Sequence, residues 1–199
     1  MARSGRLIAV EGIDGAGKTT LAEGIAAALP DVVVLREPGG AVVSERIREL
    51  VKDPTLEVDP RAEALLYAAA RAQLVGEKLL PLLAAGRDVI LDRFVDSSLA
   101  YQGAGRGLGI DAIAAVNRFA TGGLRADLTL YLRVDPAVGA ARRDGDDRLE
   151  QEGDAFFATV VAAYDALAEQ ERDRYVVLDG TEPPDVVLAT ALTVLKRLQ

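Results

Sequence analysis

The sequence of 199 residues contains no cysteine and no histidine, and these two absences exclude several chemistries. Without cysteine there are no disulfides and no thiolate nucleophiles, and without either residue the usual ligand sets of zinc are missing. A catalytic triad built on histidine is excluded as well. Any general base must therefore be a carboxylate or a lysine, unless the reaction needs none.

Long hydrophobic runs and basic charge are also scarce. No apolar stretch approaches the ~20 residues that span a membrane, and the apolar run near the N-terminus is too short for the core of a signal peptide. The formal net charge is −8, so the chain is a poor candidate for coating nucleic acid and must bind any anion through a local basic cluster. We expect a cytoplasmic protein that has no nucleic acid partner and no membrane contact.

The chain alternates between two patterns. Short runs rich in Val, Ile and Leu, typical of strands buried on both faces, occupy residues 7–10, 32–35, 89–91, 128–134 and 175–178. Segments with helical periodicity lie at about 18–29, 41–51, 59–84, 109–121, 135–143, 152–172 and 183–198. The alternation predicts an α/β fold, a five-stranded parallel sheet with helices on both faces, in a single domain spanning residues 1–199.

Two segments interrupt this alternation. Residues 97–109 carry four glycines and predict a kinked helix that runs into a loop. Residues 142–153, RRDGDDRLEQEG, are densely charged, and two interpretations are open for them. Such a run is either a solvated loop between two helices or a small mobile lid.

The clearest motif is EGIDGAGKTT, at residues 11–20, which lies between a predicted strand and a predicted helix and fits G-x-x-x-x-G-K-[ST]. Glycines allow successive backbone N–H groups to point at one anion, and the helix N-terminus adds the positive end of its dipole. We expect ATP or GTP with Mg²⁺, with Lys18 on the β- and γ-phosphates and the Thr19 hydroxyl on the metal. The predicted nucleotide-binding residues are Gly12, Ile13, Asp14, Gly15, Ala16, Gly17, Lys18, Thr19 and Thr20.

Further chemistry follows the second and third predicted strands. The third strand ends at Asp92-Arg93, where the carboxylate suits Mg²⁺ held through water and the guanidinium suits a second phosphate. The second strand ends in the turn REPGG, at the sheet edge where ligands collect in open α/β sheets. Tyr67 and Arg71 lie four residues apart on one helix face and together suit a planar base. Taken separately, Tyr67 also fits core packing and Arg71 fits a solvated face.

Together these segments resemble bacterial thymidylate kinases. EGIDGAGKTT, REPGG, DRFVDSSLAYQGAGRG, ADLTLYL and DRLEQE occur in the order and spacing of that family, and the resemblance covers nearly the whole chain. It implies a P-loop NTPase fold, phosphorylation of dTMP to dTDP by ATP and Mg²⁺ in dTTP synthesis, and a homodimer. Two alternatives stay open: a kinase of another nucleoside monophosphate or small metabolite, and a nucleotide-binding regulatory subunit without turnover.

The resemblance also implies roles for individual residues. Thr19 and Asp92 would bind the metal, Thr181 would flank the adenine, and Tyr67 would stack on thymine. The implied acceptor-binding residues are Glu37, Pro38, Arg48, Tyr67, Arg71, Arg93, Ser98, Tyr101 and Gln102.

The catalytic charge is expected to come partly from the lid. One branch of the family carries a catalytic arginine in the P-loop beside the acid, where this chain has Gly15. The resemblance therefore assigns that role to a lid within about 142–153, where Arg142, Arg143 and Arg148 are the candidates, with Arg148 favoured first and Arg143 second. Lys18, Arg93 and Asp14 complete the implied catalytic set.

Overall fold

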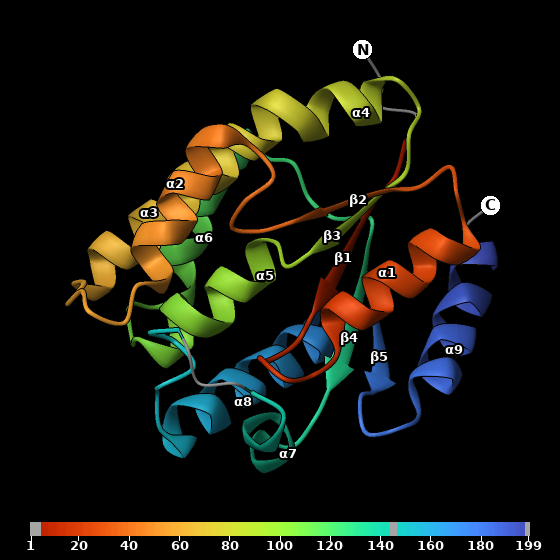
Figure 1. The fold of residues 1–199 in the computed structure, drawn as a ribbon. Helices are drawn as coiled ribbons and strands as arrows, with labels where there is room; N and C mark the ends of the chain where they lie inside the picture. The colour runs from red at the N-terminus through yellow and green to blue at the C-terminus, as the bar shows by residue number, and fades with distance from the viewer. Residues whose placement is uncertain (1–4, 144–146, 198–199) are drawn as a thin grey trace.

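The computed structural model describes residues 5–143 and 147–197. At its centre is a five-stranded sheet in which all strands are parallel and lie in the order β2-β3-β1-β4-β5 (Figure 1). The strands are β1 (Leu7–Glu11), β2 (Val33–Arg36), β3 (Val89–Asp92), β4 (Leu128–Arg133) and β5 (Tyr175–Asp179). The predicted sheet is confirmed, and the observed strand ends differ from the predicted ones by one residue at most.

Helices cover both faces of the sheet, as predicted. They are α1 (Lys18–Ala28), α2 (Val42–Lys52), α3 (Pro60–Leu74), η1 (Val75–Leu79), α4 (Leu80–Ala84), α5 (Val95–Ser98), η2 (Leu99–Gly105), α6 (Ile110–Thr121), α7 (Pro136–Ala141), α8 (Asp154–Gln170) and α9 (Pro184–Arg197). The pair α1 and α9 packs together on one face, whereas α3, α6 and α8 lie on the other (Figure 1).

The central strand β1 shows why its sequence has no polar face. All of its residues are buried. Leu7 and Ala9 pack in a cluster with Leu74 of α3, whereas Ile8 and Val10 pack in a cluster with residues of α1. Because successive side chains of a strand point to opposite faces, a strand covered on both sides is expected to be apolar on both, as β1 is from Leu7 to Val10, before the buried Glu11 at its end.

Two predicted helical segments contain wide turns. The predicted helix at 59–84 is α3 followed by the π-helical turn η1 and by α4. Pro81 in α4 has no N–H to donate to the helix ladder, and a wide turn before it relieves that break. The predicted kinked helix at 97–109 corresponds to the end of α5 and the π-helical segment η2, which carries Tyr101 and Gln102.

Three strands bring their carboxyl ends to one edge of the sheet. Asp92 of β3 is in register with Val10 of β1 on one side and with Arg36 of β2 on the other. The loop after β1, the REPGG turn and the segment after β3 therefore meet at this edge. No helix among the described residues is both long and apolar enough to cross a membrane.

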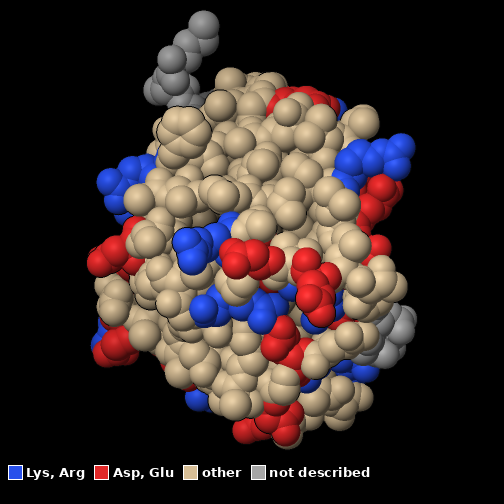
Figure 2. Space-filling view, turned by 90° about the vertical axis from the view of Figure 1, so that its left-hand side faces the viewer, with Lys and Arg blue, Asp and Glu red and all other residues tan. Residues whose placement is uncertain are grey.

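Charged side chains are unevenly spread on the side of the molecule that carries α2 and α3. Figure 2 shows that on this side they gather in a band across the middle, with broad areas above and below that carry few charges. Exposed apolar side chains of this region include Leu50 of α2 and Leu65 of α3.

Candidate active site

The loop between β1 and α1 is shaped by three glycines. Gly12, Gly15 and Gly17 have φ angles of 142°, 80° and 93°, in the range that side chains disfavour. A side chain at position 15 is also excluded by contact, because a Cβ on Gly15 would lie 2.3 Å from the carbonyl oxygen of Gly139 in α7. The backbone of the predicted phosphate loop therefore packs directly against the helix that precedes the charged segment.

Lys18 is buried at the first position of α1. Its ammonium donates to the carbonyl of Ile13 (2.8 Å) and lies 3.9 Å from the Asp14 carboxylate. Burial, reinforced by the nearby Arg93 charge, lowers the pKa of Lys18 to about 8. A buried ammonium held by its own loop is poised to exchange this carbonyl for phosphate oxygens.

Thr19 and Asp92 come together as the metal prediction requires. The Thr19 hydroxyl donates to Asp92 Oδ2 at 2.8 Å, although 73 residues separate them in the chain. Both residues line the same cavity.

Arg93 joins the loop to the segment after β3. Its guanidinium donates to Asp14 Oδ1 at 2.5 Å, to the Gly12 carbonyl at 3.0 Å and to the Ser97 hydroxyl at 3.1 Å. Burial alone would raise the pKa of the Asp14 carboxyl, but the charges of Arg93 and Lys18 hold it well below its usual range. Arg93 also has a φ of 70°, a strained backbone for a residue with a side chain, as occurs at functional sites.

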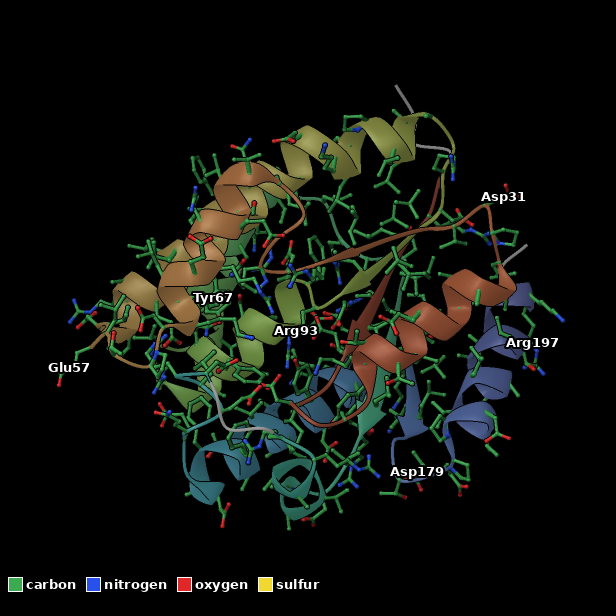
Figure 3. All side chains as sticks on the ribbon, in the orientation of Figure 1. Asp31, Glu57, Tyr67, Arg93, Asp179 and Arg197 are labelled. Atoms are coloured by element: carbon green, nitrogen blue, oxygen red, sulfur yellow. The ribbon has the colours of Figure 1, made fainter. Side chains whose placement is uncertain are left out.

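The predicted acceptor residues line one cavity of about 410 Å³. The cavity is bounded by side chains from β1–α1, the REPGG turn, α2, α3, the end of β3, η2 and the charged segment. Figure 3 labels two of its lining residues, Tyr67 on α3 and Arg93 beyond β3, both in the middle of the molecule. All predicted acceptor residues line it, namely Glu37, Pro38, Arg48, Tyr67, Arg71, Arg93, Ser98, Tyr101 and Gln102.

Arg71 is only 2% exposed and is held mainly by protein groups. It donates through Nε to Glu37 (2.6 Å), through Nη1 to Ser98 (2.8 Å) and Asn117, and through Nη2 to the Phe94 carbonyl (2.9 Å). A guanidinium has five N–H groups. Only the second N–H on Nη2 makes no hydrogen bond to residues that the structure describes, and it remains for a ligand in the cavity.

Glu37 is the buried partner of Arg71. Burial raises the pKa of its carboxyl to about 7, although the Arg71 charge opposes the rise. Its Oε1 is buried without a hydrogen-bond partner among residues 5–143 and 147–197. Arg48, at the rim of the same cavity, donates to the Pro38 carbonyl at 2.9 Å.

A second cavity, of about 770 Å³, lies along the phosphate loop. Consecutive residues from Asp14 to Leu21 line it, together with Arg142 and Arg143. The Arg143 guanidinium lies 3.7 Å from the ring centroid of Phe157, and its Nη1 has no hydrogen-bond partner within the described part of the chain. Arg142 donates to the Gly180 carbonyl at 2.8 Å.

Arg148, which the sequence favoured as the catalytic arginine of the lid, lines neither cavity. Its Nη2 forms an ion pair with the buried Glu63 at 2.7 Å, without good hydrogen-bond geometry, and its Nε donates to the Val51 carbonyl at 3.3 Å. Arg148 is thus directed to α2 and α3, whereas Arg142 and Arg143 line the cavity at the phosphate loop. Residues 144–146 of the expected lid lie outside the described residues.

Thr181, like Gly12 and Ile13 of the predicted nucleotide-binding set, lines neither cavity. Its N–H and hydroxyl both bond Asp179 Oδ1, at 2.8 and 2.6 Å. The neighbouring Gly180 and Glu182 line the second cavity instead.

Sequence reasoning missed several residues of the acceptor cavity and its support. Arg36 and Lys52 line the cavity, and Lys52 pairs with Asp147 of the charged segment at 2.9 Å. Arg36 stands in REPGG, which was a usable signal, whereas nothing near Lys52 in the sequence distinguishes it. Glu11 was also missed: this buried carboxylate accepts from the N–H of Phe94 (2.8 Å) and the hydroxyl of Ser97 (2.6 Å) and so orders the segment after β3.

Comparisons with known proteins agree with this architecture. The family model described as thymidylate kinase matches residues 10–190. The chain is 49% identical to the thymidylate kinase of Latilactobacillus sakei over 202 residues, covering 96% of this chain and 94% of the relative. It is 48% identical to that of Deinococcus radiodurans over 188 residues, covering 91% of each. The crystal structure of thymidylate kinase from Ehrlichia chaffeensis superposes with a TM-score of 0.80 at 28% identity, covering 97% of this chain and 99% of that one.

Proposed function

Because the chain belongs to the thymidylate kinase family and phosphorylates dTMP with ATP, we propose that its two cavities hold the two nucleotides with their phosphates meeting at the phosphate loop. One observation carries the proposal. Asp14, Lys18, Thr19 and Glu150 line both cavities, so these residues form the junction between them. A γ-phosphate in the larger cavity and an acceptor phosphate in the smaller one would meet there.

Transfer at this junction needs little proton chemistry. An oxygen of the dTMP phosphate attacks the γ-phosphorus, the bond to the bridging oxygen breaks, and ADP leaves. The acceptor is already an anion, so the absence of histidine is no obstacle. Catalysis consists of alignment and of neutralising charge on the transferred group.

The donor side of the junction supplies backbone N–H groups and two cations. Lys18 would leave the Ile13 carbonyl for the β- and γ-phosphates. Arg143 lies beside the loop, and its buried Nη1 has no hydrogen-bond partner among the described residues, so it is a better candidate than Arg148 for the arginine of the lid at about 142–153. Gly180 and Glu182, rather than Thr181, would flank the adenine.

Mg²⁺ is part of the proposal, and the residues present fit it. Thr19 and Asp92 offer a hydroxyl and a carboxylate 2.8 Å apart at the junction. Mg²⁺ typically takes one or two protein ligands and completes its shell with phosphates and water, which agrees with the lack of a three-acid cluster among the described residues. When bound, the ion would neutralise charge on the phosphates.

The acceptor side would recognise dTMP through side chains. Tyr67 would stack on the base, the free N–H of Arg71 and the Gln102 amide would bond its edge, with Ser98 holding Arg71. Arg48 and Arg93, joined by Arg36, would bind the phosphate, and Asp14 and Tyr101, hydrogen-bonded to each other at 3.0 Å, would face the sugar. Glu37 and Pro38 would close the pocket.

A coupled ADP-release assay with a panel of monophosphates tests this arrangement. We expect dTMP to be the best acceptor, dUMP weaker and ribonucleotides weaker still. A methyl group is worth only ~1–3 kcal/mol in a pocket, so discrimination against dUMP should be moderate. Faster turnover of CMP or GMP than of dTMP would contradict the acceptor assignment.

The homodimer implied by the family is also proposed, in a cytoplasmic enzyme. Helices α2, α3 and α6 pack side by side and expose apolar side chains, with Leu65 59% and Phe119 92% exposed. The weakly charged areas of this side (Figure 2) suit a second copy of the chain. Sedimentation of the unmodified chain should give a dimer, and the substitutions Leu65→Glu and Phe119→Glu should convert it to a monomer. A monomer already in the unmodified chain would contradict the proposed homodimer.

A further inference from the structure

Glu63 is a carboxylate in α3 that lies behind the acceptor cavity and is 0% exposed. Its Oε1 accepts from Gln102 Nε2 at 2.8 Å and from Arg106 Nε at 3.3 Å. Its Oε2 accepts from Arg106 Nη2 at 3.1 Å and pairs with Arg148 at 2.7 Å. One buried anion therefore joins a residue of the cavity wall to two arginines, one of which belongs to the charged segment.

The charge on Glu63 fixes the orientation of the Gln102 amide. An amide has a donor end and an acceptor end, whereas a carboxylate only accepts, so Nε2 must face Glu63. The opposite orientation would set two acceptors against each other in a buried position, at a high cost. Gln102 lines the acceptor cavity, and its Oε1 takes no hydrogen bond from the described residues. The amide is thus left with an oxygen for the cavity.

An oxygen at this position distinguishes between pyrimidines. Thymine and uracil carry a donor, N3–H, on the edge that pairs with other bases, whereas cytosine has an acceptor at N3. We propose that Glu63 is a positioning residue for base selection, which acts through Gln102 by presenting the amide oxygen to N3–H and opposing cytosine N3. This inference rests on the proposed function, in which Gln102 contacts the base.

The arginines on Glu63 keep this carboxylate in place. Arg106 binds it through two nitrogens and also reaches Glu152, and its guanidinium lies 5.0 Å from the ring centroid of Phe156. With this fork on one side and Arg148 on the other, Glu63 has no freedom to turn away from Gln102. The arrangement is a fixed support rather than a ligand, because Glu63 itself does not line the cavity.

The unmodified enzyme provides the first test, through kcat/KM for dUMP and dCMP. These acceptors both lack the methyl group, so their ratio isolates the edge of the base. We expect dUMP to exceed dCMP by at least about tenfold, since a site that hydrogen-bonds a donor rejects an analogue without it. Equal use of dUMP and dCMP would overturn the inference.

The second test is Glu63→Gln, measured as the same ratio. A neutral amide at position 63 can donate or accept, so Gln102 gains freedom to turn its Nε2 toward cytosine. We expect the dUMP to dCMP ratio to fall about fivefold or more, with part of the preference kept because Arg71 still presents a donor. A folded Glu63→Gln protein whose ratio stays within twofold of the parent would overturn the proposal.

Three further variants separate positioning from general damage. Glu63→Asp keeps the charge but withdraws it by one methylene, so its ratio should fall between those of the parent and Glu63→Gln, and it carries the test if Glu63→Gln fails to fold. If Glu63→Gln does not fold and Glu63→Asp keeps the ratio of the parent, the proposal is overturned. Arg148→Met removes one partner of Glu63 but leaves the contacts of Arg106 to both of its oxygens, so the ratio should stay as in the parent. Asp96→Asn removes a buried carboxylate that pairs with Arg174 at 2.8 Å and does not line the acceptor cavity, and it should also keep it.

Failure of this inference is distinct from failure of the proposed function. If the enzyme uses dTMP well and its base preference is insensitive to position 63, only the role of Glu63 falls. If dTMP itself is a poor acceptor, the proposed acceptor site falls with it.

Discussion

The two cavities are built in opposite ways. The donor cavity is lined along one side by consecutive residues from Asp14 to Leu21, and its shape depends on glycine backbone. The acceptor cavity takes side chains from separate elements and depends on buried carboxylates that hold them, Glu37 on Arg71 and Glu63 on Gln102. A site made from one stretch of backbone is specified by a single motif, whereas a site made from distant side chains can require supports outside any motif, as Glu63 is.

Among the tests of this comparison, removing the Lys18 side chain from the donor cavity should have the largest effect on turnover. Lys18→Ala is expected to lower turnover by about 10³-fold or more, because no other group can replace its charge at the phosphates. Circular-dichroism melts without nucleotide should resemble those of the parent, since the lost contact is with the loop's own carbonyl. Retained kinase activity in a folded variant would refute the donor assignment.

The lid arginines test whether the donor site also recruits side chains from a distance. We expect Arg143→Ala to lower kcat by about 10²–10³-fold while KM for dTMP changes little, because the charge acts mainly on the transferred group. Arg148→Ala should lower kcat less, since Arg148 contacts Glu63 and Val51. Steady-state kinetics at saturating ATP and Mg²⁺ decide this.

Two outcomes would change the interpretation of that experiment. A larger loss in Arg148→Ala than in Arg143→Ala would restore the ranking expected from the sequence. If both variants kept kcat within about threefold of the parent, below 1 kcal/mol of transition-state stabilisation, the charged segment would be a solvated loop.

Gly15→Ala tests the backbone side of the comparison. A Cβ at this position meets both an unfavourable φ of 80° and the Gly139 carbonyl at 2.3 Å. The matched control is Gly107→Ala, with a φ of 69° and no atom within 4 Å of the new Cβ. Denaturant unfolding should show Gly15→Ala to be less stable than the control by about 1–3 kcal/mol, the cost of the clash alone. Equal destabilisation of the two variants would mean that the loop and α7 separate easily.

The smallest effect concerns a proton on Lys18. Its pKa of about 8 lies below the ordinary value of 10.5 because burial disfavours the ammonium. Bound phosphates favour the charged form and raise this pKa, so ATP binding between about pH 8 and pH 10 should take up a fraction of a proton, and binding near pH 6.5 none. Calorimetry in buffers of different ionisation enthalpy measures the uptake. Lys18→Met is the control, and equal uptake by both proteins would contradict the assignment.

The contrast between the cavities also explains what could be predicted from the sequence. The sheet, both layers of helices and the phosphate loop follow from local patterns, and all are present. Tyr67 and Arg71 lie on α3 and line one cavity, as their helical spacing indicates, but the burial of Arg71 was not foreseeable. Its partners Glu37 and Asn117 lie 34 and 46 residues away, and no local pattern connects them.

The same limit applies to the charged segment. The motif DRLEQE drew attention to Arg148, although a motif does not indicate which side of a loop a side chain will take. Arg148 meets the buried carboxylate of Glu63, whereas Arg143 meets the ring of Phe157 beside the phosphate loop. Both outcomes depend on residues elsewhere in the chain. The Thr181 hydroxyl is directed to Asp179, whereas the neighbouring Gly180 and Glu182 line the second cavity.

The contact between Gly15 and Gly139 restricts which substitutions positions 15 and 139 can accept. A side chain at 15 would meet the carbonyl of 139, and a Cβ at 139 would lie 2.7 Å from Ile13 Cδ1 and 2.9 Å from the Asp14 carbonyl. The close approach of the phosphate loop and α7 therefore restricts both positions to glycine, and neither can take a side chain without a shift of its neighbours. An arginine at position 15 would meet the same close approach, so α7 would have to shift to admit it. The position of the catalytic arginine in the lid, as proposed above, would then be constrained by the packing of the phosphate loop against α7.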